Sequence, residues 1–173
     1  MDGGDGLIVA VDQGTSSTKA MLVDPAGRVL ATSAVPVGQH HPRPGWVEQD
    51  PGEIWRSVQR AVADLADDEA ARRVVGLALS VQRESLVVWE HDTGRALTPL
   101  LGWQDERTRE LARDLRGHAA HVFATTGLPL DPMFSALKAR WLLDRIDPER
   151  QVATSGRSRL GTLEAWLLAQ FGG

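Results

Sequence analysis

Short apolar runs broken by turn residues open the chain, and they predict strands. Residues 7–11 read LIVAV, a β-branched run of the kind that forms a buried strand. A second strand is expected at residues 18–23 and a third at residues 28–37, with the turn sequence DPAG between them. Three consecutive strands joined by short turns are expected to form an antiparallel meander.

A loop and then an amphipathic helix are predicted after the meander. Residues 38–45 contain glycines, prolines and histidines without periodicity, which is typical of a surface loop. The helix is expected to begin with Asp50 as its N-cap and Pro51 in its first turn, and to end near Asp67. Its apolar positions recur at helical spacing and would line one face: Ile54, Trp55, Val58, Val62 and Leu65.

The rest of the chain predicts more strands and then mostly helices. Residues 74–81 and 85–90 are β-like runs, and residues 91–94 form a hairpin turn into a further strand. Four helices are expected to follow, at residues 105–116, 118–125, 135–146 and 162–171. Two glycines would end the last of them. This order of elements predicts an α/β or α+β fold, in which we expect helices to cover a mixed sheet.

The composition is that of a globular protein of single-domain size, and it removes several classes of function. Of 173 residues, 42% are hydrophobic and 24% are charged, which excludes a collagen, a coiled coil or a disordered chain. A formal net charge of -4 and a pI near 5.7 argue against binding to nucleic acid or to an anionic membrane. Without cysteine there is no disulfide and no thiol nucleophile, and no apolar run reaches the about 18 residues that span a bilayer. We therefore expect a cytoplasmic protein.

The turn after the first strand has the chemistry to bind phosphate. Its sequence is DQGTSSTK: Gly14 allows close approach of the backbone, the hydroxyls and turn amides can donate hydrogen bonds, and Lys19 adds a positive charge. Asp12 could hold a magnesium ion directly or through water. The alternative is an ordinary hairpin turn, because neither the P-loop spacing nor a G-x-G-x-x-G pattern is present.

Two polar segments further along could bind an alcohol. In QRES, Arg83 would donate and Glu84 would accept hydrogen bonds from hydroxyl groups. In GWQD, the indole of Trp103 could lie against the carbon skeleton of a sugar, while Gln104 and Asp105 address its hydroxyls. The alternatives are an exposed Arg–Glu pair and a core tryptophan with Asp105 capping the next helix.

The remaining polar residues give no case for chemistry. The segment that begins at Trp46 is interpreted as packing and helix capping. The five histidines provide no third ligand for a metal, and no G-x-S-x-G elbow marks a serine nucleophile.

Six segments, taken in order, resemble the FGGY family of carbohydrate kinases, and within it the glycerol kinases most closely. They are VDQGTSSTKA at 11–20, PGWVEQDPGEIW at 44–55, QRESLVVW at 82–89, GWQDERT at 102–108, TGLPLDPMFSALKARWLLD at 126–144 and GTLEAWLL at 161–168. The resemblance implies an actin-like, ribonuclease-H-like lobe, one of two that close around ATP and substrate. It also implies transfer of the γ-phosphoryl group, with Mg²⁺, to a polyol or sugar hydroxyl, with glycerol as the leading acceptor.

Two groups of residues take roles by this resemblance. The first faces the nucleotide phosphates and, through Asp12, the magnesium ion: Thr15, Ser16, Ser17 and Lys19. The second binds the acceptor alcohol: Arg83, Glu84 and Trp103. Phosphoryl transfer depends on positioning and on charge neutralisation, and these side chains fit that requirement.

The sequence also departs from the family pattern. By the resemblance, Met133 stands where glycerol kinases carry a tyrosine whose hydroxyl helps to bind glycerol, so the identity of the acceptor is open. On the nucleotide side, Lys19 stands where they usually carry arginine. The catalytic base, the second phosphate motif and the adenine site would lie beyond Phe171. Residues 1–173 are therefore predicted to be an incomplete N-terminal domain without a catalytic residue and without kinase turnover on their own.

Other functions remain open alongside the polyol kinase. They are a non-catalytic binding or assembly module built on the same lobe, a different sugar kinase of the xylulokinase type, and an actin-like ATPase of the chaperone type. The full-length form could also assemble as a homo-oligomer.

Overall fold

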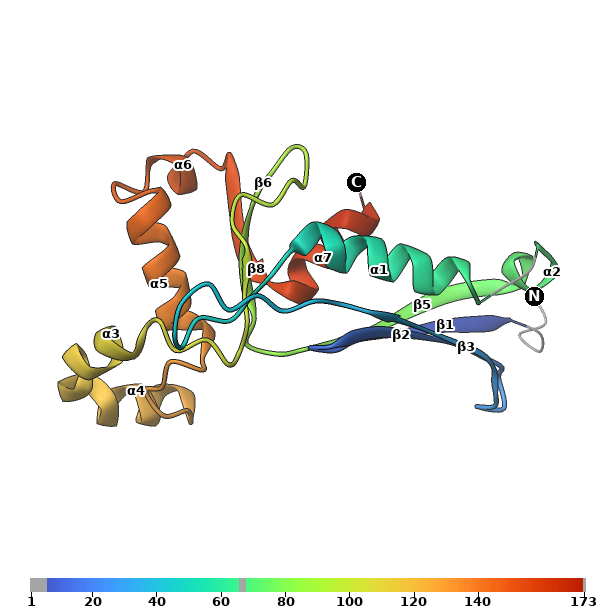
Figure 1. Cartoon of the computed structure of the whole chain (residues 1–173), viewed down its shortest axis with the longest axis horizontal. Coiled ribbons are helices and arrows are strands. Elements are labelled where there is room, and N and C mark those ends of the chain that lie inside the picture. Colours follow the sequence, from blue (N-terminus) through green and yellow to red (C-terminus); the bar gives the residue numbers. More distant parts are fainter. Residues whose placement is uncertain (1–5, 66–67, 173) are drawn as a thin grey trace. The chain divides into compact units, whose positions relative to one another are not determined.

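The computed structural model describes residues 6–65 and 68–172 of the chain (Figure 1). Contacts divide the chain into two compact units. Unit 1 comprises residues 1–39 and 50–82, and unit 2 comprises residues 40–49 and 83–173. Each unit has its own four-stranded sheet.

The sheet of unit 1 contains the predicted meander and one parallel strand. β1 (Leu7–Gln13), β2 (Ser17–Val23) and β3 (Val29–Pro36) are antiparallel neighbours, as predicted. β5 (Val74–Val81) pairs in parallel with the other side of β1, so the strand order is β3-β2-β1-β5. Together the four strands form the mixed sheet that the sequence predicts.

Helix α1 (Pro51–Ala63) lies against this sheet (Figure 1). The Asp50 side chain accepts a hydrogen bond from the Gly52 amide, which confirms the predicted N-cap. The helix ends before the predicted boundary near Asp67, which lies outside the described residues. A short helix, α2 (Asp68–Arg72), precedes β5 and was not predicted.

The core of unit 1 lies between α1 and the inward side of the sheet. Alternate residues of the two central strands are buried, as the period of two requires: Leu7, Val9, Val11, Ala20 and Leu22. Ile54, Val58 and Leu65 are buried as predicted, whereas Trp55 and Val62 are only partly buried. Ala61 takes a buried place on the same face.

The sheet of unit 2 has the strand order β4-β7-β6-β8. β4 (Glu48–Gln49) and β7 (Leu100–Leu101) are short, and β6 (Leu86–Glu90) pairs along its length with β8 (Ser158–Thr162). The predicted hairpin after β6 is reduced to an isolated bridge from Trp89 to Ala96. The main partner of β6 therefore comes from much later in the chain.

The helices of unit 2 follow the predicted order with shifted ends. They are α3 (Arg109–Asp114), the 3₁₀ turn η1 (Arg116–His118), α4 (Ala119–Thr126), α5 (Ser135–Ile146), α6 (Gln151–Thr154) and α7 (Leu163–Gly172). The bounds of α5 are those predicted, and α6 was not predicted. Gly127 ends α4 in the left-handed conformation, at φ 72°. The second glycine of the predicted last cap, Gly173, lies outside the described residues.

Strand β6 forms the centre of unit 2. Leu86 and Val88 pack with Leu101 and with Leu142 of α5. Helices α5 and α7 lie on opposite sides of the β6–β8 pair (Figure 1). Burial on both sides explains why β6 is a continuous apolar run rather than an alternating one.

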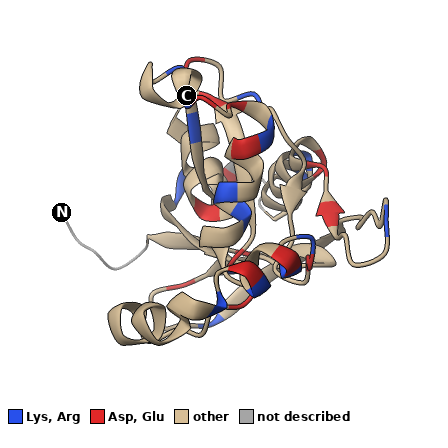
Figure 2. Cartoon of the chain, turned by 90° about the vertical axis from the view of Figure 1, so that its left-hand side faces the viewer, with Lys and Arg blue, Asp and Glu red and all other residues tan. Residues whose placement is uncertain are grey.

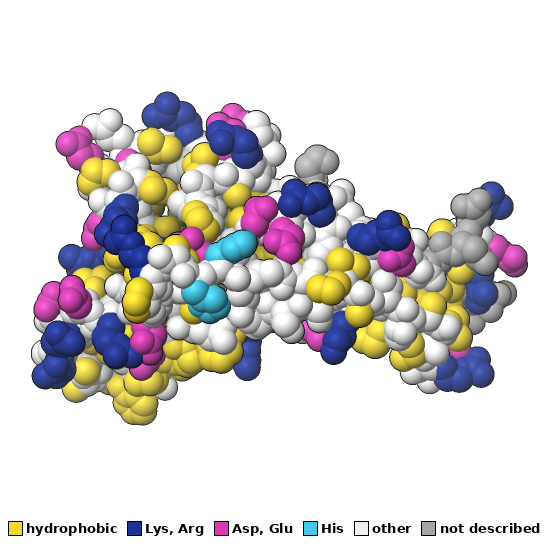
Figure 3. Space-filling model, in the orientation of Figure 1, with side chains coloured by type: hydrophobic (Ala, Val, Ile, Leu, Met, Phe, Trp, Pro, Cys, Tyr) yellow, Lys and Arg dark blue, Asp and Glu magenta, His cyan; other side chains and the backbone are white. Residues whose placement is uncertain are grey.

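The surface is mixed in character. Acidic and basic residues are interspersed along the ribbon (Figure 2). Hydrophobic side chains also reach the surface in several places (Figure 3). Val75 and Leu77, on the edge strand β5, are exposed. Within the described residues, no helix is both long enough and apolar enough to span a bilayer.

Candidate functional site

The predicted phosphate-binding turn connects β1 and β2 in unit 1, and buried glutamines hold it. The Gly14 amide donates to the Ser17 carbonyl at 2.9 Å, which closes the turn. The fully buried Gln13 side chain donates to the Gly14 carbonyl and accepts a hydrogen bond from the Gln82 side chain. The Gln82 amide donates to the Gln13 carbonyl at 2.8 Å. The turn is thus tied to the ends of both β1 and β5, a role that the sequence did not assign to Gln13.

The hydroxyl side chains of the turn divide between the surface and the core. Ser16 is exposed, and Thr15 and Ser17 are partly exposed. Thr18 is fully buried, and its Oγ1 lies 2.6 Å from the Oγ of Ser57 on α1. The fourth hydroxyl of the motif is therefore structural. The three that the family resemblance assigns to the nucleotide are the three that reach the surface.

Asp12 and Lys19 face each other across the β1–β2 pair. They are register partners, and both are exposed. Side chains directly opposite each other on an antiparallel pair share one face of the sheet, with about 4.5–5.5 Å between their Cβ atoms. Ser80 is the register partner of Asp12 on β5 and shares this face. An acid, an ammonium and a hydroxyl therefore lie together beside the turn.

The donor set at this end of the sheet fits a magnesium ion that arrives with a nucleotide. Among residues 6–65 and 68–172, no group of three His, Cys, Asp or Glu residues could hold a metal ion by itself. Mg²⁺ in phosphate-handling proteins keeps several waters and takes one or two carboxylates plus phosphate oxygens. Asp12 can supply one such carboxylate.

Glu84, in the QRES segment after β5, has an unusual backbone conformation, and its carboxylate is hydrogen-bonded through one oxygen. Its φ of 62° is left-handed, which costs a residue with a side chain about 1–2 kcal/mol. The amide and the Oγ of Ser135, at the start of α5, donate to Oε2 of Glu84 at 3.1 and 2.8 Å. Oε1 receives no hydrogen bond from the described residues. It can therefore accept one from a ligand hydroxyl, while the neighbouring Arg83 is exposed.

Trp103 and Met133 line one pocket in unit 2. The pocket has a volume of about 500 Å³, and its other lining residues are Gln104, Asp105, Glu106, Arg109, Asp131 and Pro132. Trp103 is 39% exposed and Met133 is 37% exposed. Trp103 is therefore a surface side chain that offers its indole to the pocket, and the alternative of a core tryptophan is wrong. Arg83 and Glu84 are not among the lining residues.

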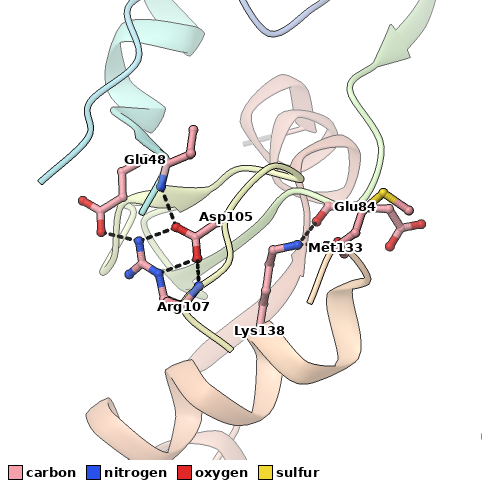
Figure 4. A network of polar contacts seen from close by, with 7 residues as sticks. Glu48, Glu84, Asp105, Arg107, Met133 and Lys138 are labelled. Carbon is pink, nitrogen blue, oxygen red and sulfur yellow. Dashed lines mark hydrogen bonds and ion pairs between the residues drawn. The ribbon is translucent and has the colours of Figure 1, made fainter. Parts of the chain in front are cut away.

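Asp105 belongs to the pocket wall but is not available to a hydroxyl. Its side chain is 0% exposed, and it accepts hydrogen bonds from the Val47 amide at 2.6 Å and from the amide and guanidinium of Arg107 at 2.8 to 3.0 Å (Figure 4). The predicted role in hydroxyl binding is therefore wrong. The alternative of a helix cap is wrong as well, because the N-cap of α3 is Thr108.

Arg107 completes this network and supports the loop that carries Trp103. Its Nη2 lies 2.7 Å from Oε1 of Glu48, and its guanidinium carbon lies 3.8 Å from the ring centre of Trp46 and 4.8 Å from that of Trp141. A planar guanidinium can bind a carboxylate with two donors and stack on an indole at the same time, which lysine cannot do. The contacts confirm Trp46 as a packing residue. The sequence did not single out Arg107.

Lys138 is a fully buried cation on α5. Its ammonium donates to the backbone carbonyls of Met133 and Glu84 (Figure 4). Burial lowers the pKa of this ammonium from 10.5 to about 8. Nearby charges modify the effect: Asp105, Glu84 and Asp131 raise the pKa, and Arg107 lowers it.

The depressed pKa of Lys138 predicts a change of stability at alkaline pH. The unfolded chain keeps this proton up to about pH 10.5, whereas the folded chain releases it near pH 8, so the unfolded state binds more protons between these values. Folding therefore becomes more favourable as pH rises through this window. Relative to Lys138→Met, the free energy of unfolding of the wild type should rise by about 1–3 kcal/mol from neutral pH to about pH 10.

Denaturant unfolding at a series of pH values measures this difference. Lys19→Met provides the matched control, because it removes a lysine from an exposed position rather than a buried one. A wild-type to Lys138→Met difference that stays constant from neutral to alkaline pH would contradict the prediction.

The fold and the turn after β1 define the class of protein. A mixed sheet with a helix on its face, and with a hairpin turn of exposed hydroxyls after its first strand, is the arrangement of the actin-like ATPase lobes, here one of α/β type. Residues 7–172 match the FGGY family of carbohydrate kinases, N-terminal domain. The chain belongs to that family.

Similar proteins are kinases of three times this length. The glycerol kinases of Citrifermentans bemidjiense and Alkalilimnicola ehrlichii are 43% and 42% identical over 170 residues, which is 96% of this chain and 34% of each relative. Glycerol kinase of Plasmodium falciparum with ADP matches with a TM-score of 0.83 and 25% identity, over 94% of this chain and 33% of that one. Xylulose kinase of Rhodospirillum rubrum matches with a TM-score of 0.79 and 25% identity, over 92% and 33%. The chain therefore spans about a third of the length of these relatives.

Proposed function

We propose that the protein containing these residues transfers the γ-phosphoryl group of ATP to a hydroxyl of a small polyol or sugar, with glycerol as the leading acceptor. The observation that carries the proposal is the carboxylate of Glu84, which Ser135 holds through one oxygen while the other stays open, in a chain of the FGGY family. We further propose that residues 1–173 form the incomplete N-terminal domain of that kinase.

On the nucleotide side, we propose that the turn after β1 binds the phosphates. Thr15, Ser16 and Ser17 would donate from their hydroxyls and amides, and Lys19 would place a positive charge beside the same oxygens. Asp12 would hold the magnesium ion, directly or through water. When bound, magnesium neutralises charge on the β- and γ-phosphates. The exposure of these side chains along one end of the sheet supports the assignment.

On the acceptor side, we propose that Glu84 accepts and Arg83 donates hydrogen bonds with the hydroxyls of the alcohol. Trp103 would lie against its carbon skeleton. Such contacts select a polyol over an apolar analogue, because the analogue leaves Oε1 of Glu84 without a partner. We assign the base that removes the hydroxyl proton to no residue within 1–173.

A pentulose is the second candidate acceptor. The presence of Met133, rather than a tyrosine, in the pocket of Trp103 favours it. Met133 lines the pocket of Trp103 with a side chain that cannot form the hydrogen bond a tyrosine would make to glycerol. Solved xylulose kinases share this fold, with a TM-score of 0.79 in one case. The pocket volume of about 500 Å³ leaves room for an acceptor larger than glycerol.

A substrate panel with Mg-ATP tests the proposal. The panel should be run on the product of the complete reading frame that contains these codons, and it should include glycerol, other polyols, pentuloses and hexoses. We expect ADP formation that depends on one of these acceptors and on magnesium. ATP turnover that is indifferent to every polyol and sugar would contradict the proposal. The isolated 173 residues are expected to show no turnover.

Replacing Lys19 is expected to weaken ATP binding without weakening acceptor binding. A hydrogen bond to a charged group contributes about 1.5–3 kcal/mol, so Lys19→Ala should raise the KM for ATP by about 10- to 100-fold. The KM for the acceptor should stay within about twofold of the wild type. Lys19→Arg serves as the matched control and should retain most of the ATP affinity. Steady-state kinetics with each substrate varied separately measure both constants, and an unchanged KM for ATP in Lys19→Ala would remove Lys19 from the site.

A further inference from the structure

We propose that Lys138 and Ser135 are positioning residues that hold Glu84 in the conformation that binds the acceptor. The inference rests on the proposed function, since it takes Glu84 as the acceptor-binding carboxylate. Neither residue touches the acceptor in this proposal. They act on Glu84 from α5, one through its backbone carbonyl and the other through its side chain.

The conformation of Glu84 requires such support. Left-handed backbone at a residue with a side chain is unfavourable and persists only where the surroundings determine it. Relaxation of φ to a negative value would turn the peptide group and carry the carboxylate away from its present direction. The contacts from α5 oppose that turn at both ends of the residue: Ser135 binds Oε2, and Lys138 binds the carbonyl oxygen at 3.4 Å.

Lys138 joins two segments that are far apart in the sequence. Its ammonium donates to the carbonyl of Glu84 and to that of Met133, whose side chain lines the pocket of Trp103 (Figure 4). A tetrahedral ammonium on a long stem can serve two carbonyls at once in a site from which water is excluded. Thus one buried cation sets the position of the acceptor-binding carboxylate relative to the wall of the pocket.

The burial of this cation also argues for a positioning role. Among the described residues, no carboxylate makes a hydrogen bond to the fully buried Lys138 ammonium. Burial of a charge in this way is unfavourable, and the depressed pKa described above reflects that cost. An apolar side chain of the same length would fill the space at less cost, but it could not bind the two carbonyls. The charged groups that face the ammonium are Glu84, Asp105, Asp131 and Arg107.

The test is the kinetics of Lys138→Met and Lys138→Arg in the product of the complete reading frame. Lys138→Met removes the donors and retains the length, so we expect the KM for the acceptor to rise by about tenfold or more. The KM for ATP should stay within about twofold. Lys138→Arg restores a cation and should recover part of the loss. Arg140→Met, an exposed change on the same helix, is the matched control and should match the wild type.

A pH profile separates positioning from simple packing. In the wild type, kcat/KM for the acceptor should fall as pH rises above about 8, because the neutral amine binds the two carbonyls more weakly. Lys138→Met should lack this fall, and Lys138→Arg should not show it below about pH 10. A wild-type profile identical to that of Lys138→Met would overturn the proposal.

Ser135→Ala keeps the proposal testable if Lys138→Met fails to fold. It removes one hydrogen bond to Glu84 at a partly buried position, and we expect a rise of about 3- to 10-fold in the KM for the acceptor. The effects of Ser135→Ala and Lys138→Met on the KM for the acceptor should be non-additive when the two changes are combined, because both contacts act on Glu84. An acceptor KM unchanged by Ser135→Ala in a folded protein would overturn the role of Ser135.

A crystal structure of a folded Lys138 or Ser135 variant distinguishes failure of this inference from failure of the proposed function. We expect Glu84 to leave its left-handed conformation or to lose its contact with α5. If Glu84 keeps its φ near 62° and its remaining contacts, the positioning role is wrong, whatever the substrate. If Glu84 moves but the wild type phosphorylates no polyol or sugar, the proposed function is wrong and the support of Glu84 stands.

Discussion

Replacing Glu84 by glutamine is expected to lower kcat/KM for the acceptor by about 10- to 100-fold, while the dissociation constant of the nucleotide stays within about twofold. Glutamine keeps the shape of the side chain and can still accept from Ser135, so the fold should be little affected. The open Oε1 loses its charge, and charge-assisted hydrogen bonds to hydroxyls are about twice as strong as neutral ones.

Kinetics with the acceptor varied, together with calorimetric titration of the nucleotide, measure the two effects separately. Glu110→Gln, on the exposed surface of α3, is the matched control for loss of one negative charge in unit 2. Arg83→Ala should also lower kcat/KM for the acceptor, since both side chains are assigned to acceptor binding. If Glu84→Gln weakened nucleotide binding and left kcat/KM for the acceptor unchanged, the assignment of Glu84 to the acceptor would be wrong.

Replacing Arg107 by methionine should destabilise the protein by about 3–5 kcal/mol, the largest effect expected on stability. The change leaves the carboxylate of Asp105, which is 0% exposed, with only backbone donors, and it removes a cation that contacts two indole rings. Removal of one partner of a buried ion pair is far more costly than loss of a surface pair. Trp103 lies on the same loop, so acceptor affinity should fall as well.

Chemical denaturation compares this change with two controls. Arg95→Met removes a guanidinium that is 67% exposed and pairs with Glu90 in the same unit, and it should cost about 0–1 kcal/mol. Asp105→Asn combined with Arg107→Met should be more stable than the sum of the single changes, because the buried carboxylate of Asp105 is then no longer left without its cation. Equal costs for Arg107→Met and Arg95→Met would show that the buried network contributes little.

Regular elements could be predicted wherever one periodicity controlled the local sequence. The β1–β2–β3 meander, the N-cap at Asp50 and the bounds of α5 followed from alternation, turn residues and capping. The helix predicted over 105–116 begins only at Arg109, because Asp105 is used by Arg107 and Val47 and does not cap a helix. Tertiary contacts decided that boundary, and the local sequence could not report them.

The elements that were missed depend on partners distant in the chain. β8 reads SRLGT, which has no strand pattern of its own and becomes a strand because β6 presents an open edge. β4 and β7 contain two residues each, too few for a periodicity. The apolar run of β6 was recognised, but its long-range pairing was not, and a local hairpin was expected instead.

The site was predicted in part by local chemistry and in part by resemblance. Local chemistry indicated the turn at Gly14 and the polar end after β5, and the structure shows Thr15, Ser16 and Ser17 at the surface with Thr18 in the core. The roles of these residues, and of Arg83, Glu84 and Trp103, remain predictions. The buried positions of Arg107 and Lys138 could not be predicted, because residue type alone does not distinguish a buried arginine or lysine from an exposed one.

We propose that the turn after β1 and the Glu84 turn serve the same phosphoryl transfer. The most direct measurement is a crystal structure of the complete protein with a non-hydrolysable ATP analogue and the acceptor identified by the substrate panel. We expect the γ-phosphorus about 3–3.5 Å from an acceptor hydroxyl that is bound to Glu84, with the phosphates on residues 14–19. Nucleotide and acceptor bound at separate places, or an acceptor that does not touch Glu84, would contradict this proposal.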